Sequence, residues 1–164
     1  MTAYVVDENV QIVANDTDPE DLTTPQANDA CKLACIQALQ SLRRHMIVVD
    51  GAGEVLARYQ ENLNWHGQPR VGDAFFKYLN EHQYDVNRVL RVDLKKDATR
   101  RFEEFPADQA LAEFDWEDRI YVALVLMAGE GALILNAVDS DYSQYKVSLE
   151  AAGANVYELC PDCI

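Results

Sequence analysis

Short apolar runs alternate with longer segments of helical periodicity along almost the whole chain. The apolar runs, each of strand length, cover residues 3–6, 46–49, 88–92, 132–138 and 155–159. The segments with helical spacing cover residues 25–44, 54–63, 71–81, 116–127 and 142–152. Strands that alternate with helices form parallel sheets covered on both faces. The order therefore predicts a three-layer α/β/α fold with a mostly parallel central sheet of about five strands.

The length of the chain is that of one domain. A chain of 164 residues, 49% of them hydrophobic, buries roughly 70% of its extended surface on folding. We find no linker or repeat, so we expect a single domain over residues 1–164. The longest apolar run, residues 120–127, is far shorter than the ~20 residues of a membrane span. Neither a basic segment nor an apolar signal segment follows Met1, so we expect a cytoplasmic protein without a membrane partner.

The charge of the chain restricts its partners. With 14 basic and 28 acidic side chains the net charge is −14, which repels nucleic-acid phosphate at long range and disfavours a general DNA-coating role. Six of the bases lie within residues 88–101. They either attract RNA phosphate, with Arg91 and Lys95 as candidate contacts, or form a solvated face of mixed charge. Trp65 lies in a loop and either stacks on a base or packs on its own helix.

Aspartates end four of the predicted strands. The carboxyl ends of parallel strands lie at one edge of a sheet, so several of these side chains could converge. Converging carboxylates repel one another unless a cation lies between them, and Mg²⁺ or Mn²⁺ prefers such oxygen ligands. Alternatively, each aspartate simply ends a strand and caps a helix. The four residues are Asp7, Asp50, Asp93 and Asp139.

More acids accompany these strand ends. Asp141 follows Asp139 at a spacing that lets both carboxylates face one ion. The segment 115–118, Asp-Trp-Glu-Asp, opens the helix predicted to end at residue 127. Asp115 is the expected N-cap of that helix, and acids in a first turn favour the helix dipole. Three acids in four positions exceed what capping needs.

Three acidic motifs occur in a fixed order, at residues 6–10, 118–123 and 137–142. They read Val-Asp-Glu-Asn-Val, Asp-Arg-Ile-Tyr-Val-Ala and Ala-Val-Asp-Ser-Asp-Tyr. In these motifs the chain resembles the PIN-domain ribonucleases, a family that includes the VapC-type toxins of bacterial toxin–antitoxin pairs. That family has Asp-Thr-Asn-Val after its first strand, an Asp before a late Ala-rich helix, and a Thr-x-Asp-x-Asp-Phe-like turn after the next strand. The resemblance extends from residue 4 to about residue 159.

The resemblance implies a metal-dependent endoribonuclease that hydrolyses RNA phosphodiester bonds and serves as a toxin or defence effector. Asp7, Asp118 and Asp139 would be the catalytic residues and would hold one or two Mg²⁺ or Mn²⁺ ions. Asp141 would be a further metal ligand, and Asn9 would orient Asp7 or a substrate phosphate. The implied partners are RNA, an antitoxin or other protein, and a second copy of the chain.

The chain departs from the family at Arg58, where the family usually has a glutamate. We expect Arg58 to point away from the acids toward Glu54, four residues earlier on the same helix. Glu54 or Glu61 would then complete the site; otherwise metal binding is weaker and catalysis is impaired. The alternative function is a catalytically impaired PIN-like module that binds proteins, as a dimer or with a basic partner. A phosphatase-like hydrolase fits less well, because no Asp-x-Asp follows the first strand.

The four cysteines form two closely spaced pairs. Cys31 and Cys35 lie four residues apart in a predicted helix, and Cys160 and Cys163 form a C-x-x-C motif. Three states remain open: a Cys₄ zinc site, a disulfide between Cys160 and Cys163, and free thiols. Free buried thiols are common on apolar helix faces, and a cytoplasmic setting disfavours the disulfide.

Overall fold

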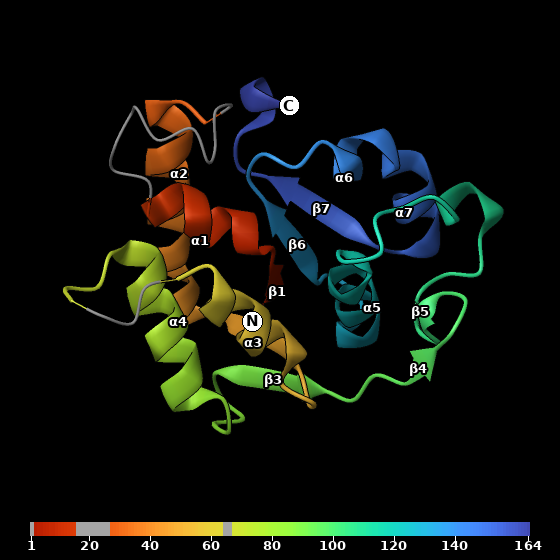
Figure 1. The fold of residues 1–164 in the computed structure, drawn as a ribbon, viewed down its shortest axis with the longest axis horizontal. Coiled ribbons are helices and arrows are strands. Elements are labelled where there is room, and N and C mark those ends of the chain that lie inside the picture. The colour runs from red at the N-terminus through yellow and green to blue at the C-terminus, as the bar shows by residue number, and fades with distance from the viewer. Residues whose placement is uncertain (1, 16–26, 64–66) are drawn as a thin grey trace.

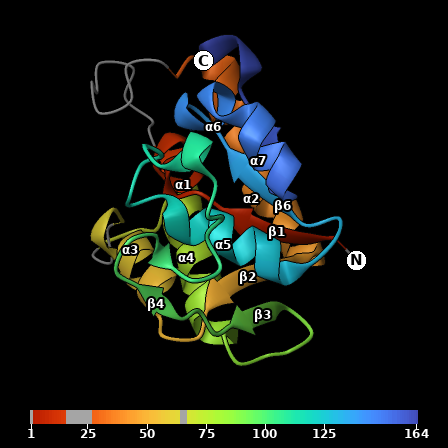
Figure 2. The same ribbon diagram turned by 90° about the vertical axis from the view of Figure 1, so that its right-hand side faces the viewer.

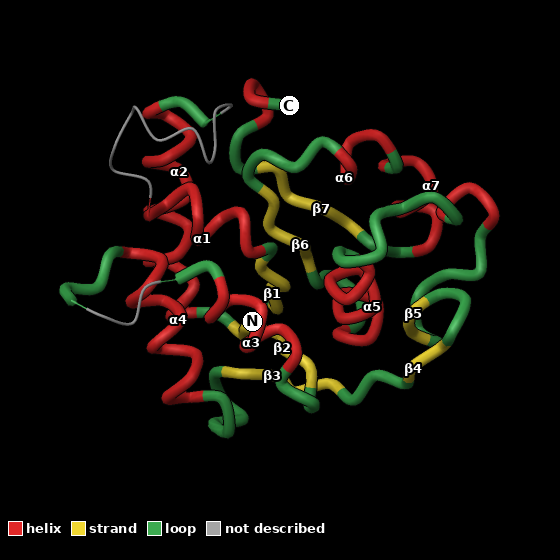
Figure 3. Tube along the Cα trace, viewed as in Figure 1, coloured by secondary structure: helices red, strands yellow, loops and turns green. Residues whose placement is uncertain are grey.

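A five-stranded parallel sheet forms the centre of the molecule (Figures 1 and 3). The computed structural model describes residues 2–15, 27–63 and 67–164. All neighbouring strands of the central sheet run parallel, in the order β3-β2-β1-β6-β7. The strands are β1 (Ala3–Val6), β2 (Met46–Asp50), β3 (Val89–Val92), β6 (Leu133–Asn136) and β7 (Asn155–Glu158). The predicted α/β class is confirmed.

Helices cover both faces of this sheet. On one face α1 (Glu8–Asn15), α2 (Asp29–Ser41) and α4 (Val71–His82) pack against one another, and α3 (Glu54–Glu61) contacts α4. On the other face lie α5 (Arg119–Ala128), α6 (Asp141–Gln144) and α7 (Lys146–Ala152) (Figures 1 and 2). The molecule therefore has the three layers that the sequence predicts.

The core lies on both faces of the central strands. Val5, Val6, Ile47 and Ile134 have no exposed surface, which explains why these strands have continuous apolar sequences rather than alternating ones. Helix α5 is buried over residues 119–125, because it packs on four strands of the sheet and on β5.

Several short elements lie outside the predicted pattern. The hairpin of β4 (Lys96–Asp97) and β5 (Arg101–Phe102) is antiparallel and belongs to a separate sheet. Three 3₁₀-helices, η1 (Leu42–Arg44), η2 (Gln109–Leu111) and η3 (Pro161–Cys163), complete the described elements. Within the described ranges, no helix has both the length and the apolar character that crossing a bilayer requires.

The structure adds one helix to the predicted set and corrects two of the predicted helices. Helix α1, directly after β1, was not predicted. The helix predicted at 25–44 begins at Asp29, where the Asn28 side chain accepts a 2.8 Å hydrogen bond from the Cys31 amide as its N-cap; residues 25 and 26 lie outside the described ranges. The helix predicted at 142–152 is divided into α6 and α7 at Tyr145, whose φ and ψ of −102° and 15° interrupt the helix.

A disulfide joins α2 to the C-terminal segment. It connects Cys31 and Cys160, whose Cα atoms are 5.2 Å apart and whose positions in the chain differ by 129 residues. Cys35 and Cys163 are free thiols. The alternative of a Cys160–Cys163 disulfide is therefore wrong, and so is the alternative of four free thiols.

Candidate metal centre

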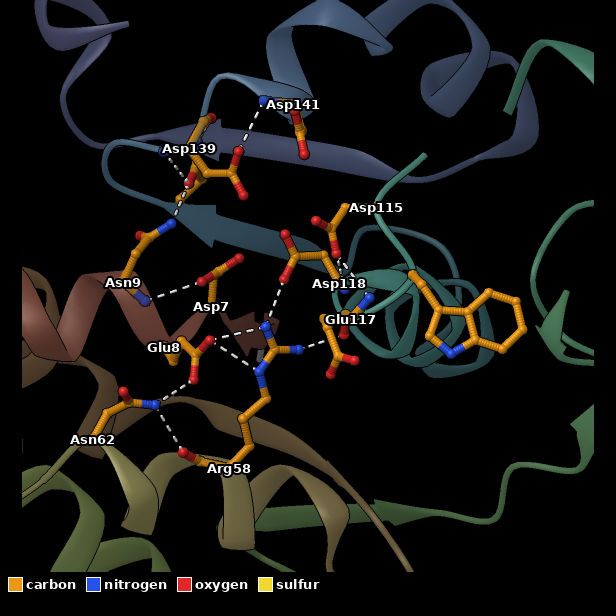
Figure 4. Close-up of polar contacts among 12 residues, drawn as sticks. Asp7, Glu8, Asn9, Arg58, Asn62, Asp115, Glu117, Asp118, Asp139 and Asp141 are labelled. Carbon is orange, nitrogen blue, oxygen red and sulfur yellow. Dashed lines mark hydrogen bonds and ion pairs between the residues drawn. The ribbon is translucent and has the colours of Figure 1, made fainter. Parts of the chain in front are cut away.

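Three carboxylates from distant parts of the chain meet at the edge of the sheet (Figure 4). Asp7 follows β1, Asp118 is the N-cap residue of α5, and Asp139 follows β6. One carboxylate oxygen from each lies within 4.8 Å of those from the other two. Strands β1 and β6 are neighbours at the point where the strand order reverses, and ligands of open parallel sheets bind in the crevice at such a point.

A second group of carboxylates shares Asp118 with the first. Oxygens of Asp115, Asp118 and Asp141 also lie within 4.8 Å of one another. Asp115 accepts hydrogen bonds from the amides of Glu117 (2.7 Å) and Asp118 (3.3 Å). Asp115 therefore caps the turn before α5, and the N-cap position that we predicted for it belongs to Asp118. We use the name acidic cluster for Asp7, Asp115, Asp118, Asp139 and Asp141.

Asp7 is the most deeply buried member of the acidic cluster, with 2% of its surface exposed. Its Oδ1 accepts a 2.9 Å hydrogen bond from the Asn9 amide, and its Oδ2 accepts a 2.7 Å bond from the Tyr142 hydroxyl. Burial raises the pKa of Asp7 to about 7, against the effect of these two bonds, and the charge of Asp139 contributes in the same direction as burial. A cation in the cluster would oppose this effect and favour the ionised carboxylate.

Asn136 fixes the turn that carries Asp139. This amide is fully buried at the end of β6, and its Nδ2 donates to the Asp139 carbonyl oxygen (2.8 Å). Its Oδ1 accepts hydrogen bonds from Asn9 Nδ2 (2.8 Å) and the Asp139 amide (3.2 Å). The Asn9 side chain therefore connects α1 to the turn after β6, while its backbone amide contacts Asp7. Sequence analysis missed Asn136, because an amide at the end of an apolar strand has no recognisable motif.

Arg58 points into the acidic cluster, so the expectation that it points away was wrong. Its Nη2 lies 2.8 Å from Asp118 Oδ1 and 2.8 Å from Glu8 Oε1. Its Nη1 donates to the Glu117 carbonyl oxygen, and its guanidinium carbon lies 5.1 Å from the centroid of the Tyr121 ring. Burial raises the pKa of Asp118 well above its usual range, and the charges of neighbouring carboxylates add to this rise, which Arg58 partly offsets.

Glu54 is engaged elsewhere, which explains the direction of Arg58. Its carboxylate pairs with Arg101 and with Lys96 Nζ, the latter at 3.0 Å. Glu61 is exposed on α3. Among the described residues, neither glutamate lies with other carboxylates in a group that could bind a metal. Neither one therefore substitutes for the glutamate that the family has at the place of Arg58.

Among the residues predicted to contact substrate, Asn9 contacts Asp7, whereas the described hydrogen bonds of Arg91 and Lys95 go to residues outside the acidic cluster. Arg91 donates to the Gly51 carbonyl oxygen (2.8 Å) and to Gln83 Oε1 (3.1 Å), which fixes the turn after β2. Lys95 is exposed between β3 and β4. Trp65 lies outside the described residues. An aromatic side chain that sequence analysis did not select, Trp116, is 44% exposed beside Asp115 in the chain.

The other two strand-end aspartates have separate roles. Asp50 is buried, and its carboxylate accepts hydrogen bonds from the amides of Glu54 (2.9 Å) and Val55 (2.8 Å). It therefore caps α3, which is the alternative role that the sequence suggests for an aspartate at the end of a strand. Asp93 is exposed after β3 and belongs to neither described group of potential metal ligands.

The acidic cluster fits a small divalent cation by its chemistry. All of its donors are carboxylate oxygens, which Mg²⁺ and Mn²⁺ prefer over softer ligands. The buried Tyr121 hydroxyl also has no hydrogen-bond partner among the described residues. The Tyr121 ring lies beside the acidic cluster, because the guanidinium carbon of Arg58, which pairs with Asp118, is 5.1 Å from the ring centroid. Burial raises the pKa of Tyr121. A buried hydroxyl without a partner is costly unless a ligand or water satisfies it.

Comparison of the chain with protein-family models, with curated proteins and with solved structures gives no match.

Proposed function

We propose that the protein is a metal-dependent endoribonuclease of the PIN type that hydrolyses RNA phosphodiester bonds. The observation that carries this proposal is the meeting of Asp7, Asp118 and Asp139 within 4.8 Å at the β1–β6 crevice. Three separate segments place carboxylates there although their mutual repulsion and burial are unfavourable. A divalent cation offsets both costs.

The residues of the chain have distinct roles in this proposal. Asp7, Asp118 and Asp139 hold the metal. The carboxylates of Asp115 and Asp141 lie close enough to Asp118 to be ligands of a second ion. The bound metal supplies Lewis-acid chemistry, polarising the phosphate and lowering the pKa of an attacking water. Tyr142 and the Asn9 amide orient Asp7 through their hydrogen bonds. Arg58 orients Asp118 and brings positive charge to the place where a phosphate would lie.

The position of Arg58 determines how fast we expect the protein to cleave RNA. Its charge offsets part of the negative charge that recruits a cation, and it occupies Oδ1 of Asp118. The acidic cluster has five carboxylates, however, and Arg58 also binds Glu8 outside the cluster. Metal binding is therefore weakened rather than prevented, and we expect slow cleavage that Mn²⁺ supports. RNA is the proposed substrate, and a role as a cytoplasmic toxin or defence effector with a protein antitoxin follows from the family resemblance.

The ion pair between Arg58 and Asp118 also favours a second candidate function. If the positive charge of Arg58 alone offsets the repulsion among the carboxylates, the domain needs no metal and works as a protein-binding module. The net charge of −14 would then attract a basic partner, either another protein or a basic segment of a second copy.

A cleavage assay separates the two candidates. Single-stranded RNA labelled at one end is incubated with the protein and Mn²⁺, with Mg²⁺, or with a chelator. We expect slow endonucleolytic cleavage with Mn²⁺, none with the chelator, and none from Asp118→Asn. Arg58→Glu, which introduces the family residue, should cleave faster than the wild type. Asp93→Asn removes an exposed carboxylate after a neighbouring strand and serves as the matched control with wild-type activity.

The binding-module function has its own outcome in this assay. If neither the wild type nor Arg58→Glu cleaves any RNA while both remain folded with Mn²⁺ present, the ribonuclease proposal is wrong.

A further inference from the structure

The four cysteines, from opposite ends of the chain, gather at one place on the molecule. The C-terminal turn lies against the N-terminal end of α2 in both Figure 1 and Figure 2. The Sγ atoms of Cys31, Cys35 and Cys160 all lie within 4.8 Å of one another, and these three residues are buried. Cys163 belongs to η3, three residues after Cys160, and is partly buried.

Each pair of cysteines lies within one short turn of backbone. Cys31 and Cys35 are one turn apart on α2, where residues at i and i+4 share a helix face. Cys160 and Cys163 are joined by a 2.9 Å hydrogen bond from the Cys163 amide to the Cys160 carbonyl oxygen, which closes the turn between them. The pKa of Cys35 is raised to about 12 by burial and, second, by the neighbouring Cys163. Cys163 is therefore near Cys35, although its Sγ lies outside the group that the other three sulfurs form within 4.8 Å.

The disulfide involves only two of the four cysteines. Cys31 and Cys160 form it, while Cys35 and Cys163 stay beside it as free thiols. A covalent link between α2 and the C-terminal segment needs no further cysteine. Four thiolates from two closely spaced pairs are, in contrast, the ligand set of a structural zinc ion, whose sulfurs lie about 2.3 Å from the metal and about 3.8 Å from one another.

We propose that, once the Cys31–Cys160 disulfide is reduced, Cys31, Cys35, Cys160 and Cys163 bind one Zn²⁺ ion that holds the C-terminal segment against α2. Zinc and the disulfide exclude each other, because both need the sulfurs of Cys31 and Cys160. The thiols lose their protons as the metal binds, so the high pKa of Cys35 in the metal-free protein is overcome by the charge of the ion. This site shares no residue with the acidic cluster, and the proposal does not depend on ribonuclease activity.

Cobalt binding to the whole chain tests the proposal. A phosphine first reduces the disulfide: the two sulfurs accept two electrons and two protons, and phosphorus takes up the oxygen of one water. Co²⁺ is then added without oxygen. We expect thiolate-to-cobalt charge-transfer bands and the intense visible bands of a tetrahedral site, saturating at one Co²⁺ per chain. Zn²⁺ should abolish these bands by displacement.

Two sets of variants make the result specific. Cys35→Ser and Cys163→Ser should each lose the tetrahedral cobalt spectrum, although both can still form the Cys31–Cys160 disulfide and therefore fold when oxidised. Asp139→Asn should keep the spectrum, because it changes only the acidic cluster. The proposal is overturned if the reduced wild type shows no thiolate–cobalt bands, or if either serine variant leaves them unchanged. It is also overturned if circular dichroism shows that the reduced chain unfolds and that Zn²⁺ does not restore the fold.

Discussion

Arg58 Nη2 lies 2.8 Å from Asp118 Oδ1, so a guanidinium from α3 contacts the carboxylate at the start of α5. The same nitrogen lies 2.8 Å from Glu8 Oε1, and only 17% of the Arg58 side chain is exposed. A positive charge is therefore part of the acidic cluster before any metal binds. We expect this charge to stabilise the protein in the absence of metal, and under the proposed function it would compete with a metal for Asp118.

Replacing Arg58 should destabilise the metal-free protein. Arg58→Met leaves Glu8 and Asp118 close together without their shared cation, which we expect to lower the free energy of unfolding by about 1–3 kcal/mol. Urea unfolding in the presence of a chelator measures this change. The matched control is Arg88→Met, because Arg88 pairs with Asp85 at a site where the two side chains are 47% and 37% exposed, and this change should alter stability by about 0.5 kcal/mol or less. Equal effects of the two variants would contradict the structural role of Arg58.

Removing the hydroxyl should change the free energy of unfolding differently at two buried tyrosines of the site. Tyr142→Phe removes the 2.7 Å hydrogen bond to Asp7 and should cost about 1–3 kcal/mol, since the acceptor is buried and is left without this partner. Tyr121→Phe removes a hydroxyl without a partner among the described residues, so the metal-free protein should be unchanged or more stable. Thermal and urea unfolding of both variants test this difference. A Tyr121→Phe variant as unstable as Tyr142→Phe would show that the hydroxyl has a partner.

The raised pKa of Asp7 predicts how stability depends on pH without metal. The pKa is about 7 in the folded protein and 3.8 for an ordinary aspartate, so between these values the folded state binds the proton more tightly. The free energy of unfolding should therefore fall as the pH rises from about 4 to about 7, by at most about 1.4 kcal/mol per pH unit from this group. The raised pKa values of Asp118 and Asp141 act in the same direction.

Asp7→Asn should flatten this pH dependence, because the amide does not ionise. Asp93→Asn controls for the loss of one negative charge and should keep the wild-type slope. Urea unfolding at several pH values from 4 to 8, with a chelator present, gives the slopes. A wild-type stability that rises through this range, or a slope that Asp7→Asn leaves unchanged, would contradict the assigned environment of Asp7.

Divalent metal should stabilise the folded protein at neutral pH. A ligand at about 100 times its Kd contributes about 2.7 kcal/mol, which for a chain of this size raises the Tm by roughly 5–10 °C. We expect this shift with millimolar Mn²⁺. Asp139→Asn should reduce it strongly, whereas Asp93→Asn should leave it intact. Equal shifts in both variants would place the stabilising ion outside the acidic cluster.

Most of the fold follows from patterns that the sequence displays locally. The strand predicted at residues 3–6 has the same bounds as β1, and the other four central strands have boundaries within two residues of those predicted. Continuous apolar runs identify buried parallel strands, and the rule that their carboxyl ends share an edge brings Asp7 and Asp139 together. The two-residue strands of the hairpin have no such pattern, and α1 was overlooked because it follows β1 without an intervening turn.

The direction of Arg58 and the cysteine pairing could not be predicted in the same way. Glu54, four residues before Arg58, is the obvious partner on an isolated helix, but Arg101 takes that carboxylate from 47 residues away. Cys163 lies only three residues after Cys160 and is the nearest candidate partner in the sequence. Cys160 instead forms its disulfide with a residue 129 positions earlier. Both outcomes depend on which distant segments the fold brings together, and a single sequence does not show such contacts.

The most direct test of a metal centre at the β1–β6 crevice is anomalous diffraction from a crystal soaked in Mn²⁺. We predict a manganese peak between Asp7, Asp118 and Asp139, with carboxylate oxygens of all three about 2.0–2.6 Å from the ion and Arg58 still bound to Glu8. A peak that is absent at millimolar Mn²⁺, with Arg58 lying among the three carboxylates, would contradict the account and favour the binding module.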